Sequence, residues 1–250
     1  MEDLDEAITS HRQALSLQPE GHPNRSYSLN GLTFALSTRF KQMGAMEDLE
    51  EAIRFNRQGF ALQPQGHPYR SHFLSNSPVL VSTRFEQMGI LEDLKEAITY
   101  NRQTLALRPQ GHPNCSNSLN NLAGTLSTGF QHFGVMEDLK EAITYYHEAL
   151  ALSLGHPEHS QLLSNLANAV FTRFQQLGRM EDLEEAITYF HQALTLLPQG
   201  HPSRSDSLNG LAAALGTRFQ NLGGMENLEE AITCLRQALT LQTSRSFRSS

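Results

Sequence analysis

The sequence has no long apolar run, no cluster of basic residues and only two cysteines, and each shortage excludes a class of protein. No stretch approaches the ~18 apolar residues that a membrane-spanning helix needs, and the acidic start MEDLDEAI is unlike a signal peptide. The 19 basic and 26 acidic residues give a formal net charge of −7. Because the basic residues form no run, nucleic acid is disfavoured as a partner. We expect a cytoplasmic chain with no membrane contact.

Catalytic and metal-binding motifs are also missing. The sequence contains no HExxH, no paired CxxC, no GxGxxG, no GKS or GKT and no nucleophile elbow. A GHP tripeptide recurs with its histidine at His22, His67, His112, His156 and His201. These histidines belong to packed elements about 10 Å apart, too far to share a zinc ion with bonds of about 2.0–2.1 Å. We predict a turn motif with a local imidazole hydrogen bond, and a chain that is not an enzyme and holds no metal or cofactor.

The sequence does contain one pattern that recurs from end to end. Its copies start at residues 1, 46, 91, 136, 180 and 225. A fixed period in this range is typical of a stacked array in which each copy contacts only its neighbours. We predict one solenoid over residues 1–243, followed by a disordered tail at 244–250.

Each copy holds two amphipathic helix patterns with a 3.6-residue period. In the fifth copy, the first apolar stripe is Leu183, Ala186, Ile187, Phe190, Ala193, Leu194 and Leu197, and the second is Leu208, Leu211, Ala212, Leu215, Phe219 and Leu222. Asp182 with Glu185 predicts a capping box at the start of the first helix. Ser205 or Ser207 is expected to cap the second helix and Gly223 to end it. No alternating stretch predicts a strand, so the fold class is all-α.

The two cysteines occupy different places in copies far apart in the array. Cys115 and Cys234 are therefore expected to be free thiols in a reducing compartment. Cys115 stands where other copies have Arg25, Arg70 and Arg204, which favours a tolerated substitution.

The spacing of Ala186, Phe190, Ala193 and Pro198 resembles the second helix of the tetratricopeptide repeat. The LNNLA and GHP elements look like the extended variety found in kinesin light chains. The whole unit is similar to arrays in fungal proteins that also carry caspase-like (CHAT-type) peptidase or signalling NTPase domains. The resemblance implies a right-handed α-solenoid of stacked helical hairpins, with a concave groove that holds a peptide or partner helix.

The second helix of each copy, which we call the inner helix, carries an arginine near its end in four of the first five copies. This arginine is present as Arg39, Arg84, Arg173 and Arg218, and the third copy has Gly129 instead. Two interpretations are open. The arginines either pair with acidic residues of the next helix or offer a spaced series of guanidinium groups to an acidic ligand.

A recurrent polar pair precedes the small residue of the inner helix. Its asparagines are Asn30, Asn76, Asn120, Asn121, Asn165 and Asn209. The resemblance places them in the groove, where an amide can both donate to and accept from an extended peptide. Alternatively, they pack polar edges between neighbouring hairpins.

Inner-helix positions that vary between copies are expected to set ligand choice. One level contains Tyr27, His72, Asn117, Gln161 and Asp206, and a second contains Phe34, Val79, Gly124, Asn168 and Ala213.

The array has two irregular places. The first helix has no preceding partner and keeps an apolar stripe that includes Leu4 and Ile8, which predicts a fragment of a longer array or self-association through the ends. In the second copy, Pro78 would interrupt a helix at a cost of about 3 kcal/mol. We therefore expect that helix to begin late, with Ser77 as its cap, and the copy to be either a hinge or merely degenerate.

Two functions follow from these observations. The leading one is a non-enzymatic scaffold that binds a protein or peptide in its groove. The alternative is a regulatory or sensor array of a larger protein with a peptidase or NTPase domain.

Overall fold

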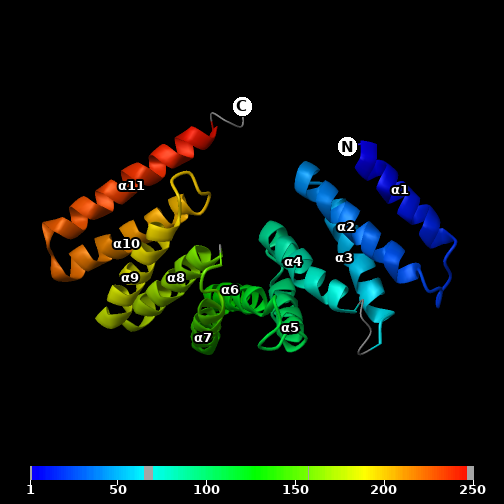
Figure 1. The fold of residues 1–250 in the computed structure, drawn as a ribbon, viewed down its shortest axis with the longest axis horizontal. Coiled ribbons are helices and arrows are strands. Elements are labelled where there is room, and N and C mark those ends of the chain that lie inside the picture. The colour runs from blue at the N-terminus through cyan, green and yellow to red at the C-terminus, as the bar shows by residue number, and fades with distance from the viewer. Residues whose placement is uncertain (1, 65–69, 157, 247–250) are drawn as a thin grey trace. The chain divides into compact units, whose positions relative to one another are not determined.

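The computed structural model describes residues 2–64, 70–156 and 158–246, and every regular element in that part of the chain is an α-helix (Figure 1). The helices are α1 (Glu2–Ser16), α2 (Arg25–Met43), α3 (Met46–Ala61), α4 (Arg70–Met88), α5 (Leu91–Ala106), α6 (Cys115–Phe133), α7 (Met136–Leu152), α8 (His159–Leu177), α9 (Met180–Leu196), α10 (Arg204–Leu222) and α11 (Met225–Ser246). The all-α prediction is confirmed. None of the described helices combines the length and the apolar composition needed to cross a bilayer.

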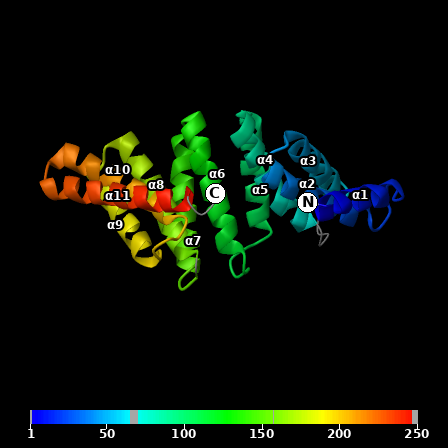
Figure 2. The same cartoon turned by 90° about the horizontal axis from the view of Figure 1, so that it is seen from above.

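The helices form two compact units, Met1–His112 and Pro113–Ser250. Within each unit every helix packs against the next one in sequence, as Figure 2 shows. In the second unit α8 also contacts α6 and α10, so the even-numbered helices touch one another along the stack. We call the even-numbered helices the inner helices and the odd-numbered ones the outer helices.

Each inner helix is joined to the next outer helix by a tight turn that begins with glycine. Gly44 and Gly178 have φ of 73° and 67°, and their N–H groups donate to Phe40 O and Phe174 O, each at 2.7 Å. This left-handed conformation is one that glycine adopts without steric cost. Gly223, the predicted end of α10, has φ of 75° and is confirmed. The turn fixes the reversal of the chain in each hairpin.

The predicted capping box of α9 is wrong. The helix begins at Met180, two residues before Asp182, and has no side-chain cap. The Asp182 side chain is buried and accepts a hydrogen bond from Arg173 of the preceding inner helix. A carboxylate that pairs with a neighbouring helix gives the same sequence pattern as a carboxylate that caps its own helix.

The predicted caps of α10 are also wrong. The helix begins at Arg204 and has no side-chain cap. The Ser207 hydroxyl donates to Ser203 O from inside the helix, at 3.0 Å, and the Ser205 hydroxyl lies 3.5 Å from Ala238 O of α11. The serines contact their own turn and the next outer helix.

Small residues allow the helices to approach closely. Ala52, Ala97, Ala142 and Ala186 occupy the same place in successive outer helices, and each has no exposed surface. Alanine has no side chain beyond Cβ, so a neighbouring backbone can pack at about 8–10 Å.

The late start predicted for the helix around Pro78 is wrong. Helix α4 runs from Arg70 to Met88 with Pro78 inside it. Proline has no N–H, so Leu74 O loses its usual intrahelical donor. The Thr104 hydroxyl of α5 lies 3.2 Å from that carbonyl and 2.9 Å from Tyr100 O, and it can donate to either. The neighbouring outer helix therefore offers a replacement donor, which the sequence pattern of α4 alone cannot show.

The two ends of the chain differ from expectation. Helix α2 covers the stripe of α1, so Ile8 is only 2% exposed and Leu4 is half-buried. Apolar exposure instead occurs on α11, where Ile232, Leu235 and Leu239 are exposed. Helix α11 continues to Ser246, three residues past the predicted end of the solenoid at 243, and residues 247–250 of the predicted tail lie outside the described residues.

Candidate binding surface on the inner helices

The recurrent arginines pair with the next outer helix. Arg39 donates from Nε and Nη2 to the two carboxylate oxygens of Asp48, at 2.8 and 2.6 Å, and from Nη1 to Asp5 at 2.6 Å. Arg84 makes the same bidentate contact with Asp93 and a further bond to Glu50 at 3.0 Å. Each arginine thus links an inner helix to the outer helices on both sides.

The other two arginines also contact the next outer helix, and Arg218 reaches the preceding one as well. Arg173 donates to Asp182 at 2.7 Å and lies 3.3 Å from Glu185. Arg218 donates to Asn227 at 2.8 Å and to Glu184 at 2.9 Å. The pairing interpretation is confirmed by these contacts. A ligand-binding role for the arginines stays a prediction, and it would require one of these pairs to open.

The pairing of Arg84 with Asp93 also stabilises the charged form of the arginine. Hydrogen bonding to Asp93 raises the pKa of Arg84 above its ordinary value, against the effect of burial. In the third copy Gly129 provides no guanidinium, and Asp138 is half-buried where Asp48 and Asp93 are buried. The α6–α7 hairpin therefore lacks the cation that the other hairpins carry.

The asparagines of the polar pair form cross-links between inner helices. Asn76 Nδ2 of α4 lies 3.4 Å from Asn30 Oδ1 of α2, and Asn165 Nδ2 of α8 donates to Asn120 Oδ1 of α6 at 3.0 Å. Asn165 also accepts from Gln161 at 3.0 Å. These contacts agree with the interpretation that the asparagines pack between neighbouring hairpins. They involve Asn30, Asn76, Asn120 and Asn165.

The remaining two asparagines are exposed. Asn121 lies on α6 and Asn209 on α10. The structure brings Asn121 next to Asn120 at a pocket between α6 and α8, described below, whereas Asn209 lines none of the three pockets described here. A peptide-binding role for these residues stays a prediction.

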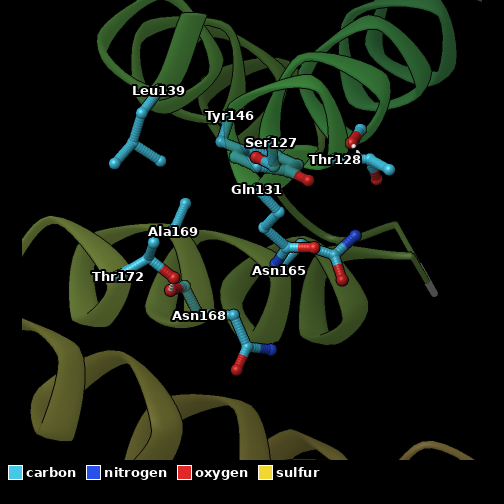
Figure 3. Close-up of a pocket in the computed structure, with 10 residues that line it drawn as sticks. Ser127, Thr128, Gln131, Leu139, Tyr146, Asn165, Asn168, Ala169 and Thr172 are labelled. Atoms are coloured by element: carbon cyan, nitrogen blue, oxygen red, sulfur yellow. Dashed lines mark hydrogen bonds between the residues drawn. The ribbon is translucent and has the colours of Figure 1, made fainter. Parts of the chain in front are cut away.

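Two pockets occupy equivalent places between consecutive inner helices, one in each unit. The α2–α4 pocket has a volume of about 250 Å³, and Phe34 and Val79 stand on its two sides. The α6–α8 pocket, drawn in Figure 3, has a volume of about 190 Å³. Gly124 and Asn168 line it at the matching positions. These four residues belong to the second variable level predicted from sequence. The site therefore repeats while its walls change from copy to copy.

A further pocket lies along the same pair of helices, α6 and α8. It has a volume of about 270 Å³ and is lined by Asn117, Asn120, Asn121, Glu158, Gln161 and Leu162. Asn117 and Gln161 belong to the first variable level. Asn120 lines this pocket and Asn165 lines the pocket around Gly124, so the bond between the two asparagines joins the two hollows.

Comparison with known proteins identifies the fold. The sequence model described as "Tetratricopeptide repeat" matches residues 220–244, which span the end of α10 and most of α11. The chain folds as an array of tetratricopeptide repeats. No curated protein matches the sequence at a significant level.

Several solved structures share this arrangement of helices. One contains nearly identical TPR-like repeats of a putative kinesin light chain from Podosopora anserina, with 23% identity and a TM-score of 0.59 over 90% of this chain and 98% of that one. BtubC (BKLC) from P. vanneervenii has 14% identity and a TM-score of 0.65 over 98% of this chain and 90% of that one. YrrB, a TPR protein with a peptide-binding site, has 14% identity and a TM-score of 0.56 over 95% of this chain and 100% of that one.

The GHP segments that the structure describes form turns, as predicted. In three of them the backbone N–H two residues after the histidine points at its Nδ1, at 3.2 Å for His22, 3.5 Å for His156 and 3.2 Å for His201. His112 makes an interaction of its own, and His67 lies outside the described residues. In the part of the chain that the structure describes, no group of three His, Cys, Asp or Glu side chains could hold a metal ion.

Sequence reasoning missed one structural role in the array. Arg204 donates to Leu194 O at 2.7 Å and to Leu197 O at 2.5 Å, so it caps the end of the preceding outer helix. Arg25 and Arg70 contact the matching carbonyls of α1 and α3. The signal was available, since the arginine recurs at one place in the repeat, next to a predicted helix end.

Proposed function

We propose that this tetratricopeptide array is a non-enzymatic scaffold that binds a peptide or partner helix along the grooves between its inner helices. The observation that carries this proposal is the repetition of one pocket between α2 and α4 and between α6 and α8, with walls that differ between copies. A constant framework with variable pockets is typical of a surface that recognises side chains along a chain.

Three further features support a protein ligand. Tetratricopeptide repeats generally mediate protein–protein interaction, and the YrrB structure is described as having a peptide-binding site. The net charge of −7 disfavours nucleic acid. The lining of the α6–α8 pockets is rich in amide and hydroxyl groups, which can donate to and accept from a peptide. We propose a cytoplasmic site of action, and the regulatory array attached to a peptidase or NTPase domain stays a prediction.

Asn121 provides the sharpest test because it is exposed and lines the groove without a cross-link of the kind that Asn165 makes. Peptides would be selected from a random dodecapeptide library with the intact chain. Asn121→Ala is expected to change the free energy of unfolding by less than about 0.5 kcal/mol. It is expected to weaken binding of the selected peptides by about 1–3 kcal/mol, the cost of an unpaired polar group.

Asn221→Ala is the matched control, since Asn221 is an exposed asparagine at the end of α10 that lines none of these pockets. It should leave peptide affinity unchanged. If no peptide is selected, or if both variants bind as the parent does, the groove is not the binding surface.

A further inference from the structure

The α6–α8 pocket around Gly124 contains a tyrosine hydroxyl that no other copy of the repeat provides. The aromatic position of the outer helices carries His11, Asn56, Asn101, Tyr146, Phe190 and Leu235 in successive copies. Tyr146 is 4% exposed and belongs to α7, yet it lines the pocket between the two inner helices. Figure 3 shows it with Ser127 on one side of the pocket and the residues of α8 on the other.

The glycine that accommodates Phe190 in the fifth copy is absent at the matching place after Tyr146. Phe190 of α9 packs against Gly210 of the following inner helix, where an added Cβ would lie 2.4 Å from the ring. At the matching place after Tyr146 the chain has Asn165, which leaves no such space. Tyr146 instead reaches the preceding inner helix, and its hydroxyl lies 3.5 Å from where a Cβ on Gly124 would stand.

Two hydroxyl groups in this pocket have a hydrogen available. Among the described residues the Ser127 hydroxyl oxygen is buried and has no hydrogen-bond partner. Burial raises the pKa of Tyr146 to about 12, and the smaller opposing effect is an interaction of the Ser127 hydroxyl with the Tyr146 oxygen that does not reach hydrogen-bond geometry. Tyr146 therefore stays a neutral phenol at physiological pH, and both groups can donate to a ligand.

Two other hydroxyl groups have oxygen lone pairs available but have already committed their hydrogens. Thr128 donates to Gly124 O at 3.1 Å, and Thr172 donates to Asn168 O at 2.8 Å. Each oxygen can still accept. The pocket thus combines donors with acceptors.

The pocket is also without charge. Its lining consists of Gly124, Ser127, Thr128, Gln131, Leu139, Tyr146, Asn165, Asn168, Ala169 and Thr172. The α2–α4 pocket has Lys41 where this pocket has Gln131, and Phe34 where it has Gly124. A charged ligand group would lose its hydration here without a counter-charge, which is costly.

We propose that the α6–α8 pocket is a subsite for a primary amide side chain, asparagine or glutamine, of the bound peptide. A primary amide has a carbonyl oxygen that accepts two hydrogen bonds, matching Tyr146 and Ser127, and an NH₂ group that donates, matching Thr128 and Thr172. A carboxylate would lack the donors and meet no cation. A lone hydroxyl could accept from both donors but has a single hydrogen, so it would leave one of the two threonine oxygens unused. This subsite rests on the proposed peptide-binding function.

The test uses the peptides selected on the intact chain from the random dodecapeptide library. Each asparagine or glutamine in a selected peptide is replaced in turn by alanine and by the matching acid, and affinity is measured by fluorescence anisotropy. We expect one position at which both replacements weaken binding about tenfold, the effect of one to two lost hydrogen bonds. In the Tyr146→Phe variant, the parent peptide should lose most of this tenfold in affinity. The peptide with alanine at that position should bind the variant as well as it binds the parent protein.

Tyr145→Phe is the matched control, because the neighbouring Tyr145 hydroxyl contacts Glu141 of its own helix at 2.9 Å and does not line the pocket. Ser127→Ala serves as a second variant should Tyr146→Phe fail to give the parent circular dichroism spectrum.

The outcomes separate the two proposals. If no peptide is selected, the peptide-binding function and the subsite both fail. If peptides bind but replacing their amides has no effect, or has the same effect with Tyr146→Phe as with the parent protein, the subsite is wrong and the binding function stands. Preference for the acid over the amide would also overturn the subsite in favour of a carboxylate.

Discussion

At the scale of residues, a threonine in α5 compensates for the backbone donor that is lost at the proline inside α4. The position of Thr104 carries alanine or glycine in every other copy, as Ala14, Gly59, Ala149, Ala193 and Ala238. Among the described helices only α4 contains a proline in its interior, and the Thr104 hydroxyl lies 3.2 Å from the carbonyl that this proline leaves without its donor. A buried carbonyl without a partner costs about 1–3 kcal/mol. The pair Pro78 and Thr104 is thus a local solution within one interface.

Thr104→Val tests this coupling because valine keeps the shape and removes the hydroxyl. We expect the free energy of unfolding to fall by about 1–3 kcal/mol, measured by urea denaturation. In a Pro78→Ala background Leu74 O regains an N–H donor, so the cost of Thr104→Val should shrink by about 1 kcal/mol or more.

Thr99→Val is the control, since the exposed Thr99 hydroxyl bonds only to its own helix at Lys95 O. Equal costs of Thr104→Val with and without Pro78 would show that the hydroxyl does not serve the freed carbonyl.

At the scale of elements, the outer helices bury one face through the inner helix that follows them. Ile187 and Phe190 of α9 are buried against α10, together with Leu208 and Leu211. Helix α11 keeps the same stripe, and its Ile232 and Leu235 are 41% and 52% exposed. The outer helix that leaves this apolar face exposed is therefore α11. The expectation that α1 exposes such a face is wrong for Ile8, which is buried.

Self-association through α11 is the expected consequence. A second copy of the chain could cover the exposed stripe, because apolar burial contributes about 25 cal/mol per Å². We expect sedimentation velocity to show a weight-average mass that rises with protein concentration, and Leu235→Lys to suppress the rise.

Leu154→Lys is the matched control, since Leu154 is 78% exposed and lies between α7 and α8. A monomer at all concentrations, or equal effects of the two substitutions, would contradict association through α11.

At the scale of the whole molecule, contacts are local along the sequence. Within each unit a helix packs mainly against its neighbours in the stack, and the chain divides into Met1–His112 and Pro113–Ser250. In such an array stability is approximately a sum of repeat terms and nearest-neighbour terms. A defect should therefore loosen its own part of the array more than distant parts.

Leu166→Ala is expected to show this locality. Leu166 has no exposed surface in α8, so its truncation should cost about 2–5 kcal/mol. Hydrogen exchange followed by mass spectrometry should show faster exchange in α6–α11 and a much smaller change in α1–α5.

Leu32→Ala is the reciprocal variant, because Leu32 is equally buried in α2. It should produce the opposite distribution. If each variant accelerates exchange in both units to the same extent, the chain unfolds as one cooperative body and the locality argument is wrong.

The sequence by itself determined the helices, their period and their turns. The apolar stripe around Leu183 and Ile187 predicted α9, and Gly223 predicted the end of α10, because helix periodicity and glycine conformation depend on residues close in sequence. The stacking of hairpins followed from the repeat. The recurrent arginines left two interpretations open, and only the structure showed that they pair with Asp48 and Asp93.

Tertiary structure decided which side chains serve the stack and which remain available. Asp182 carries a capping pattern but accepts from Arg173, and Pro78 stays within α4, where Thr104 lies against the freed carbonyl. Phe190 packs on Gly210 of α10, where a Cβ would clash with the ring, whereas Tyr146, with Asn165 at the matching place, lines the pocket beside Gly124 of α6. Each of these outcomes depends on partners 9 to 30 positions away that the stacking of helices brings together, as the separations of Arg173 from Asp182 and of Thr104 from Leu74 show. A pattern read within one helix does not contain that information.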